Sequence, residues 1–296
     1  MYDIIIVGAG PAGLTSAIYA CRAKKSVLVL EANTYGGQIV STPDIENYPV
    51  EEHISGFDFA TKLYNQTKNL GAEIKFEKVI NIEDGELKKV MTTKNSYECK
   101  AIILATGAEN RKLGLPNEDE LVGKGVSYCS TCDGMFYKGK NVAVVGGGNT
   151  ALEDALYLSE ICNTVYLIHR RDTFRADEAL IDEINKCKNI KCIMNSRVTK
   201  LNASDKLSSI EINSDSTIAV DGIFIAVGRV PENQNFAKII NLNDFGYVIA
   251  SEDCHTNVEG IFVAGDNRTK LLRQLVTATG DGAVAATEAI KYINRW

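Results

Sequence analysis

The sequence predicts an α/β fold with two doubly wound units, because one order of strand, glycine loop, helix and strand occurs twice. In the first copy, the strand, the loop and the second strand are residues 3–7, 8–13 and 27–30. In the second copy they are residues 141–145, 146–151 and 165–168. The second strand ends at Glu31 in one copy and at His169 in the other, each 23 positions after the first glycine of its loop. The repeated layout predicts two nucleotide-binding units of the Rossmann type.

The remaining elements follow along the chain. Phe59, Leu63 and Leu70 recur near helical spacing and predict a helix over 57–70. Short strands are expected at 74–82 and 90–93, and apolar segments that end in glycine close the two halves at 101–107 and 222–228. A further buried strand is expected at 260–266 and a last helix at 280–293. The second unit is complete by Gly228, so the final segment can return to the first unit, which spacing alone leaves open.

Bulk composition is that of an ordinary globular protein. The 296 residues are 45% hydrophobic and 24% charged, which is enough chain for two compact domains. The net charge of -6 gives a nucleic-acid partner little electrostatic support. No apolar run approaches the roughly 20 residues of a membrane span. The N-terminus leads straight into a strand and leaves no room for a signal peptide, so the eight cysteines fit a reducing cytoplasm.

The first glycine loop predicts a dinucleotide site. Gly8, Gly10 and Gly13 stand between an apolar strand and a helix, where glycines let the backbone approach a pyrophosphate. Glu31 ends the next strand and can accept hydrogen bonds from a ribose. A merely structural tight turn is the alternative, and this surrounding order disfavours it.

The second loop carries a different end signal. It closes with Ala151 in place of a third glycine, and its following strand ends in His169, Arg170 and Arg171, with Arg175 one turn further on. Guanidinium groups match phosphate oxygens bidentately, so the 2′-phosphate of NADPH is the expected ligand. A solvated basic turn is the alternative.

Cys129 and Cys132 form a Cys-X-X-Cys pair before the second loop. Such a pair can form a reducible disulfide and can lower the pKa of one thiol. Zinc is the competing ligand, although Cys187 and Cys192 would make a poor second pair. Asp133 adjoins the pair and can exchange the proton that dithiol chemistry needs, or it can cap a helix. The other cysteines are expected to be inert: Cys21, Cys99, Cys162, Cys187, Cys192 and Cys254.

Together these motifs resemble the low-molecular-weight, bacterial-type thioredoxin reductases over essentially the whole chain. The residues that match that family's FAD-binding segments are Gly8, Gly10, Pro11, Ala12, Gly13, Glu31, Gly36, Gly37, Gln38, Asn47, Ala105, Thr106, Gly107, Gly265, Asp266, Arg273, Gln274 and Leu275. Those that match its NADPH segments are Gly146, Gly148, Asn149, Thr150, His169, Arg170, Arg171 and Arg175. One departure is Ser130, where the family often has alanine.

The resemblance implies a discontinuous FAD domain, residues 1–113 and 245–296, with an NADPH domain inserted at 114–244. It implies that NADPH reduces FAD, that the flavin reduces the Cys129–Cys132 disulfide, and that the dithiol reduces thioredoxin or a similar small protein. Cys132 would face the flavin, Cys129 would attack the partner and Asp133 would protonate the leaving thiolate. A homodimer is usual in the family. Nucleic acid, membrane and metal are not expected partners.

Chain order adds an expectation about motion. The cysteines precede the second glycine loop by 14 to 17 residues, so they belong to the inserted domain. A rotation about hinges near 114–116 and 243–246 is therefore expected. Two alternatives stay open: a ferredoxin-driven or peroxide-system disulfide reductase of the same fold, and a flavin- and zinc-binding regulatory protein.

Overall fold

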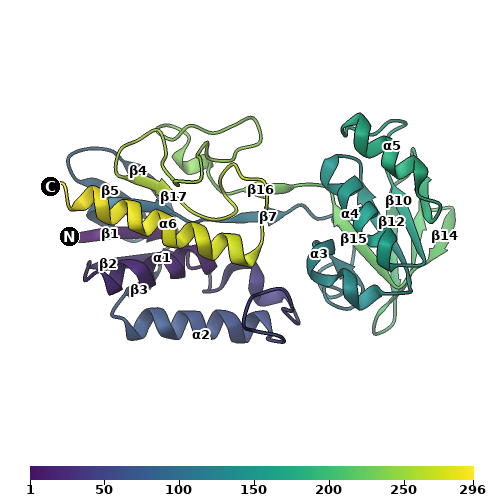
Figure 1. Ribbon diagram of the computed structural model, residues 1–296, viewed down its shortest axis with the longest axis horizontal. Coiled ribbons are helices and arrows are strands. Elements are labelled where there is room, and N and C mark those ends of the chain that lie inside the picture. Colours follow the sequence, from purple (N-terminus) through teal and green to yellow (C-terminus); the bar gives the residue numbers. More distant parts are fainter. The chain divides into compact units, whose positions relative to one another are not determined.

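The computed structural model describes all 296 residues, which form two compact units (Figure 1). Unit 1 combines residues 1–109 with 230–296, and unit 2 is the inserted segment 110–229. The chain crosses between them at two short paired strands, β7 (Ala108–Asn110) and β16 (Arg229–Pro231). The final segment thus returns to the first unit, as the family resemblance implies.

Unit 1 is built on a seven-stranded mixed sheet. Its elements are β1 (Tyr2–Val7), α1 (Pro11–Arg22), β2 (Val27–Glu31), η1 (Gly37–Ser41), α2 (Gly56–Asn69), β3 (Glu73–Phe76), β4 (Val79–Glu83), β5 (Lys88–Thr92), β6 (Ser96–Leu104), η3 (Gln234–Phe236), β17 (Ile261–Val263) and α6 (Leu275–Ile293). The strands β3, β2, β1 and β6 are parallel, as is β17 beside β6, and β5 and β4 extend the sheet in antiparallel fashion.

Alternation along the parallel strands divides the core of unit 1 into two layers. Ile4 and Ile6 of β1 face one layer, in which α1 and α6 pack through small residues such as Ala17 and Ala286. Ile5 faces the other layer, which the segments after β16 help to cover. The predicted sheet and its helical cover are confirmed.

Unit 2 repeats the parallel plan. Its elements are β8 (Val126–Ser127), α3 (Ser130–Asp133), η2 (Gly134–Tyr137), β9 (Asn141–Gly146), α4 (Asn149–Ile161), β10 (Thr164–Ile168), α5 (Glu178–Lys186), β11 (Ile190–Ile193), β12 (Val198–Ala203), β13 (Leu207–Ile212), β14 (Ser216–Ala219) and β15 (Gly222–Ala226). The parallel order is β11-β10-β9-β15-β8. Helices α4 and α5 pack on one face, and the antiparallel sheet β12-β13-β14 packs on the other.

The return to unit 1 comes earlier than the boundary expected at 244/245. Residues 230–244 lie in unit 1, where Phe236 and Ile240 are buried in the same cluster as Ile5. The boundary is set by apolar contacts between residues far apart in the chain. The proline and asparagine residues of this segment indicate only a local break, so they do not reveal those contacts.

Neither predicted hinge lies at a crossing between the units. The Glu118 carboxylate accepts the backbone N–H groups of Leu113, Gly114 and Leu115, which makes a fixed turn inside unit 2. The side chain of Asn243 accepts two N–H groups of its own turn inside unit 1. The last helix also begins before residue 280, because Gln274 and Thr277 form a reciprocal capping box at its start.

Candidate active site

The glycines of the first loop are of two kinds: two are tightly packed and one faces open space. A Cβ on Gly8 would lie 2.3 Å from the Ala105 carbonyl oxygen, and one on Gly13 would lie 2.0 Å from that of Gly8. A Cβ on Gly10 would meet nothing within 4 Å. Gly10 caps α1 without a side-chain hydrogen bond, and Pro11 begins the helix. Gly8 and Gly13 therefore bring strand and helix together, while Gly10 leaves the helix N-terminus open to an anion.

Neighbouring segments gather around this loop. The Glu31 carboxylate accepts the Ala9 N–H at 2.7 Å, and the Gly36 N–H donates to the Ala9 carbonyl at 2.8 Å. A Cβ on Gly37 would lie 3.4 Å from the Cα atom of Gly10. The Gln38 side chain donates a hydrogen bond to the Ala108 carbonyl. Glu31 thus holds the loop from the end of its own strand.

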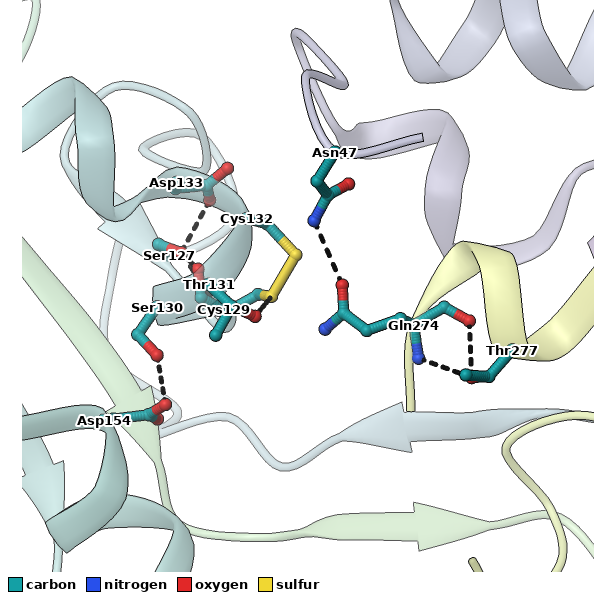
Figure 2. Close-up of a disulfide and its surroundings, with 10 residues drawn as sticks. All are labelled: Asn47, Ser127, Cys129, Ser130, Thr131, Cys132, Asp133, Asp154, Gln274 and Thr277. Carbon is teal, nitrogen blue, oxygen red and sulfur yellow. Dashed lines mark hydrogen bonds between the residues drawn. A yellow bond between two sulfur atoms is a disulfide. The ribbon is translucent and has the colours of Figure 1, made fainter. Parts of the chain in front are cut away.

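The C-terminal segment closes the same region. A Cβ on Gly265 would lie 2.9 Å from the Cβ of Ala12 in α1. Asn47 donates to the Gln274 side chain at 3.2 Å, although the two are 227 residues apart (Figure 2). Arg273 donates to the Asp266 carbonyl at 3.3 Å, and Leu275 begins α6. The sequence-predicted FAD segments of unit 1 are therefore brought together.

A polar network lies at the end of β6 in unit 1. Thr106 donates to the Asn233 side chain at 3.1 Å, and Asn267 donates to Thr106 at 3.0 Å. Asn233 and Asn267 are fully buried. The network fixes the Ala105-Thr106-Gly107 turn against the segments that follow β16 and β17.

The second glycine loop likewise combines tight packing at Gly146 with open space at Gly148. A Cβ on Gly146 would lie 2.5 Å from both the Ala151 Cβ and the Ala226 carbonyl oxygen. Gly148 caps α4 without a side-chain hydrogen bond, and a Cβ on it would meet only the Arg175 carbonyl oxygen, at 3.8 Å. The N-terminus of α4 is therefore open, as that of α1 is.

The basic residues surround this second loop. The His169 ring is buried and would meet a Cβ on Gly147 at 2.0 Å, and its Nε2 has no hydrogen-bond partner. The Arg175 N–H donates to the Gly147 carbonyl at 2.6 Å. Arg170 and Arg175 are exposed, and Arg171 is half-buried. Asn149 and Asp177 exchange hydrogen bonds beside the loop.

Cys129 and Cys132 form a disulfide at the start of α3, with Cα atoms 5.3 Å apart (Figure 2). Ser127 fastens the two ends of this turn, because its hydroxyl accepts the Cys129 N–H at 3.1 Å and donates to Asp133 Oδ2 at 2.6 Å. In this state the sulfurs are bonded to each other, so the pair does not present two thiolates to zinc. Each cysteine is half-buried, and Thr131 between them is exposed.

Asp133 directly follows Cys132 in the chain, and its carboxylate accepts a hydrogen bond from the Ser127 hydroxyl. Burial raises the pKa of its carboxyl, and the Ser127 hydrogen bond lowers it by less. Its Oδ1 atom is buried without a hydrogen-bond partner. The side chain makes no capping hydrogen bond to the next turn, η2, so the helix-cap alternative is not observed. A carboxyl with a raised pKa, on the residue that follows a disulfide cysteine, is suited to holding a proton.

Titratable groups outside the disulfide turn include three buried thiols and one cluster of a histidine with two carboxylates. Burial raises the pKa of Cys99 and of Cys254 to about 12 and that of Cys162 to about 11, which keeps these thiols protonated. His53 pairs with Asp44 at 2.8 Å, and together with Glu46 they place three donor atoms within 4.8 Å of one another.

Several supporting residues carry no sequence signal. Asp154 accepts a hydrogen bond from Ser130, and Asp281 accepts one from the Gly265 N–H. Their partners lie 24 and 16 residues away, outside any motif spacing.

Comparisons with known proteins agree with this geometry. The pattern of the pyridine nucleotide-disulphide oxidoreductases matches residues 2–282. Thioredoxin reductase of Listeria monocytogenes is 44% identical over 99% of this chain and 94% of its own length, and that of Bacillus subtilis is 40% identical over 99% and 95%. The crystal structure of thioredoxin reductase from Streptococcus pyogenes has a TM-score of 0.96 at 39% identity and covers 100% of this chain and 99% of its own.

Two glycine loops with open helix N-termini and a disulfide place this chain in the pyridine nucleotide-disulphide oxidoreductase family. Within that family it belongs with the low-molecular-weight thioredoxin reductases. It is an oxidoreductase whose family uses a flavin and a nicotinamide cofactor. No helix combines the length and apolar character that crossing a membrane requires.

Proposed function

We propose that this enzyme uses NADPH to reduce the disulfide of thioredoxin or of a similar small protein, with FAD as the intermediate carrier. The observation that carries the proposal is the Cys129–Cys132 disulfide on the same unit as the second glycine loop and its arginines. The bound cofactors supply the hydride and electron transfer. The chain supplies binding, orientation and thiol chemistry.

FAD is assigned to unit 1, which replaces the sequence limits 1–113 and 245–296 by 1–109 and 230–296. The open space at Gly10 and the uncapped start of α1 suit a pyrophosphate. Glu31 is placed at the ribose end of that loop, although it already accepts the Ala9 N–H. The contacting segments are assigned residue by residue from the resemblance, with Asn47 and Gln274 as one hydrogen-bonded pair.

NADPH is assigned to unit 2. Gly148 leaves the N-terminus of α4 open to the pyrophosphate, and Arg170, Arg171 and Arg175 follow the end of β10, where the 2′-phosphate belongs. Three guanidinium groups there favour NADPH over NADH because an arginine fork pairs with phosphate oxygens. These groups also argue against a ferredoxin-driven reductase, which has no need of a second nucleotide site.

Thiol exchange is assigned to the cysteine pair in its reduced form. The Cys129 thiolate attacks one sulfur of the partner disulfide, forms a mixed disulfide and releases the partner's other sulfur as a thiolate. The Cys132 thiolate then attacks Cys129, restores the Cys129–Cys132 bond and releases the second partner thiolate. Asp133 donates the proton to a leaving thiolate. Partner disulfide is reduced and the enzyme dithiol is oxidised, so the two electrons balance.

A rotation of unit 2 about β7 and β16 belongs to the proposal, because the nicotinamide site and the disulfide share unit 2 while the flavin is assigned to unit 1. A homodimer in the cytoplasm, without a structural metal, completes it; light scattering and metal analysis of the purified protein test the dimer and the metal.

The central test is an anaerobic titration of the flavin-loaded enzyme with NADPH and, separately, with NADH. NADPH should bleach the flavin at stoichiometric amounts, and NADH should require a large excess. Added oxidised thioredoxin should then restore the flavin absorbance and gain two thiols. Bleaching without transfer to any protein disulfide would refute the reductase function.

A further inference from the structure

Ser130 lies between the two cysteines and is almost completely buried, with 1% of its surface exposed. A buried hydroxyl without a partner is costly, and the partner here is the Asp154 carboxylate, to which Ser130 Oγ donates (Figure 2). Asp154 lies on α4, 24 residues further along the chain. The redox turn is therefore tied by a side chain to the helix that begins at the second glycine loop.

This tie matters because α3 is only four residues long. So short a helix has no stability of its own and depends on its contacts. The Ser127 contacts join one end of the turn to the other, from Cys129 to Asp133. Ser127 ends the adjoining strand β8, whereas the Ser130–Asp154 bond joins the turn to α4, the helix that follows the second glycine loop.

We propose that Asp154 is a positioning residue, which holds the Cys129–Cys132 turn in its disulfide geometry on α4 through the hydroxyl of Ser130. The inference rests on the proposed disulfide chemistry. Asp154 does not touch the reacting sulfurs in this account, and its effect reaches them through Ser130.

The strength of this hold depends on pH. Burial is the main cause that raises the pKa of Asp154 to about 6. The Ser130 hydrogen bond and the charge of Arg229 in β16 lower this pKa by less, and the charge of Glu153 raises it further. A hydroxyl donates more strongly to a carboxylate than to a carboxylic acid. The turn is therefore held more tightly above pH 6 than below it.

Other charged and titratable groups surround α4. Asp133 of α3 titrates with its own raised pKa, and Tyr137 of η2 has a pKa raised by burial to about 12. The charged side chains of α5 are exposed to solvent: Glu178, Asp182, Glu183 and Lys186. Because Asp133 contributes its own pH dependence, the test compares variants at Asp154 with the unmodified enzyme.

The experiment equilibrates the flavin-loaded enzyme with mixtures of reduced and oxidised dithiothreitol between pH 5.5 and 7.5. The redox state of Cys129 and Cys132 is read by thiol labelling and mass spectrometry of their peptide. Asp154→Asn mimics the protonated acid, Ser130→Ala removes the donor, and the double variant combines the two. Glu160→Gln removes an exposed charge of the same helix that does not influence Asp154, and it is the matched control.

At pH 7.5 the equilibrium should shift toward the dithiol by about 3-fold in Asp154→Asn and by about 10-fold in Ser130→Ala, since each loses part or all of a charge-assisted bond. At pH 5.5 Asp154→Asn should match the unmodified enzyme. The double variant should equal Ser130→Ala, because one interaction cannot be lost twice. Glu160→Gln should behave as the unmodified enzyme does.

Three results would overturn the inference: no shift in either single variant, an equal shift in Glu160→Gln, or an Asp154→Asn shift that persists when Ser130 is alanine. The readout is the state of the sulfurs and not turnover, so these results leave the proposed function standing. Conversely, a disulfide that NADPH cannot reduce in the unmodified enzyme would refute the function and leave the Asp154 contact untouched.

Discussion

The Asp281 carboxylate accepts two hydrogen bonds of 2.8 Å from the guanidinium of Arg268, a pair that is almost completely buried. Lys270 adds a third bond at 2.8 Å, and the Gly265 N–H adds a fourth at 2.9 Å. Asp281 stands in α6, and its donors all come from the segment after β17. One acid therefore fixes the backbone of the segment that is assigned to the flavin.

Replacing Asp281 with alanine should destabilise unit 1 strongly. Arg268 and Lys270 would stay buried without their main counter-charge, which typically costs roughly 3–5 kcal/mol. The temperature of thermal unfolding and the fraction of flavin retained should both fall. Glu288→Gln, which removes an exposed ion pair of the same helix with Lys291, should change either by little. Equal effects of the two variants would contradict this role of Asp281.

The same carboxylate should make stability sensitive to acid. Burial raises the pKa of Asp281, but Arg268 and Lys270 outweigh burial and hold it below the ordinary value of 3.8. A lowered folded pKa gives stability that is present above the unfolded pKa and is lost as pH falls through the folded one. In thermal melts from pH 7 to pH 3, the advantage over Asp281→Asn should shrink below about pH 4. A constant difference throughout would argue against the pair.

The two kinds of glycine in the first loop should separate folding from binding. Gly10→Ala adds a methyl group to open space, so the apoprotein should melt within a few degrees of the unmodified one while FAD affinity falls by at least about 10-fold. Gly13→Ala places its Cβ 2.0 Å from a carbonyl oxygen and should impair folding itself. Reconstitution of apoprotein with FAD measures both. Unchanged FAD affinity in Gly10→Ala would remove the phosphate assignment.

Removing Arg170 and Arg171 together should weaken NADPH binding by at least about 100-fold and NADH binding little. Each charge-assisted contact is worth roughly 1.5–3 kcal/mol. Flavin bleaching at varied nucleotide concentration measures both affinities. Arg197→Ala, at another exposed arginine of unit 2, is the control. An unmodified enzyme that uses the two nucleotides equally well would rule out this assignment.

The two cysteines should differ in trapping. Cys129→Ser and Cys132→Ser should both keep NADPH-driven flavin reduction and lose protein-disulfide reduction, because hydride transfer precedes thiol exchange. Only Cys132→Ser should accumulate a mixed disulfide with the partner, since its Cys129 still attacks and nothing resolves the product. Cys192→Ser, at an exposed free cysteine, should stay fully active. Retained reductase activity in both pair variants would make the disulfide merely structural.

The sequence predicted what depends on neighbours along the chain. Both glycine loops follow apolar strands and precede helices, and backbone geometry leaves glycine as the residue that fits at Gly8 or Gly13. Successive side chains of the parallel strands point to opposite faces of the sheet. Because these strands are apolar on both faces, each face must be covered by helices or by another sheet. The cysteine pair needs only three residues of spacing. Such features are local, so periodicity and short motifs identify them.

Tertiary structure alone decided the rest. Only the folded chain brings Asn47 to Gln274, Ser130 to Asp154 and Arg268 to Asp281, because these partners are joined by packing and not by spacing. Packing of Phe236 and Ile240 likewise moved the return into unit 1 to residue 230. A buried polar group must find a partner, but which one depends on how sheets and helices stack, and that stacking is a property of the whole fold.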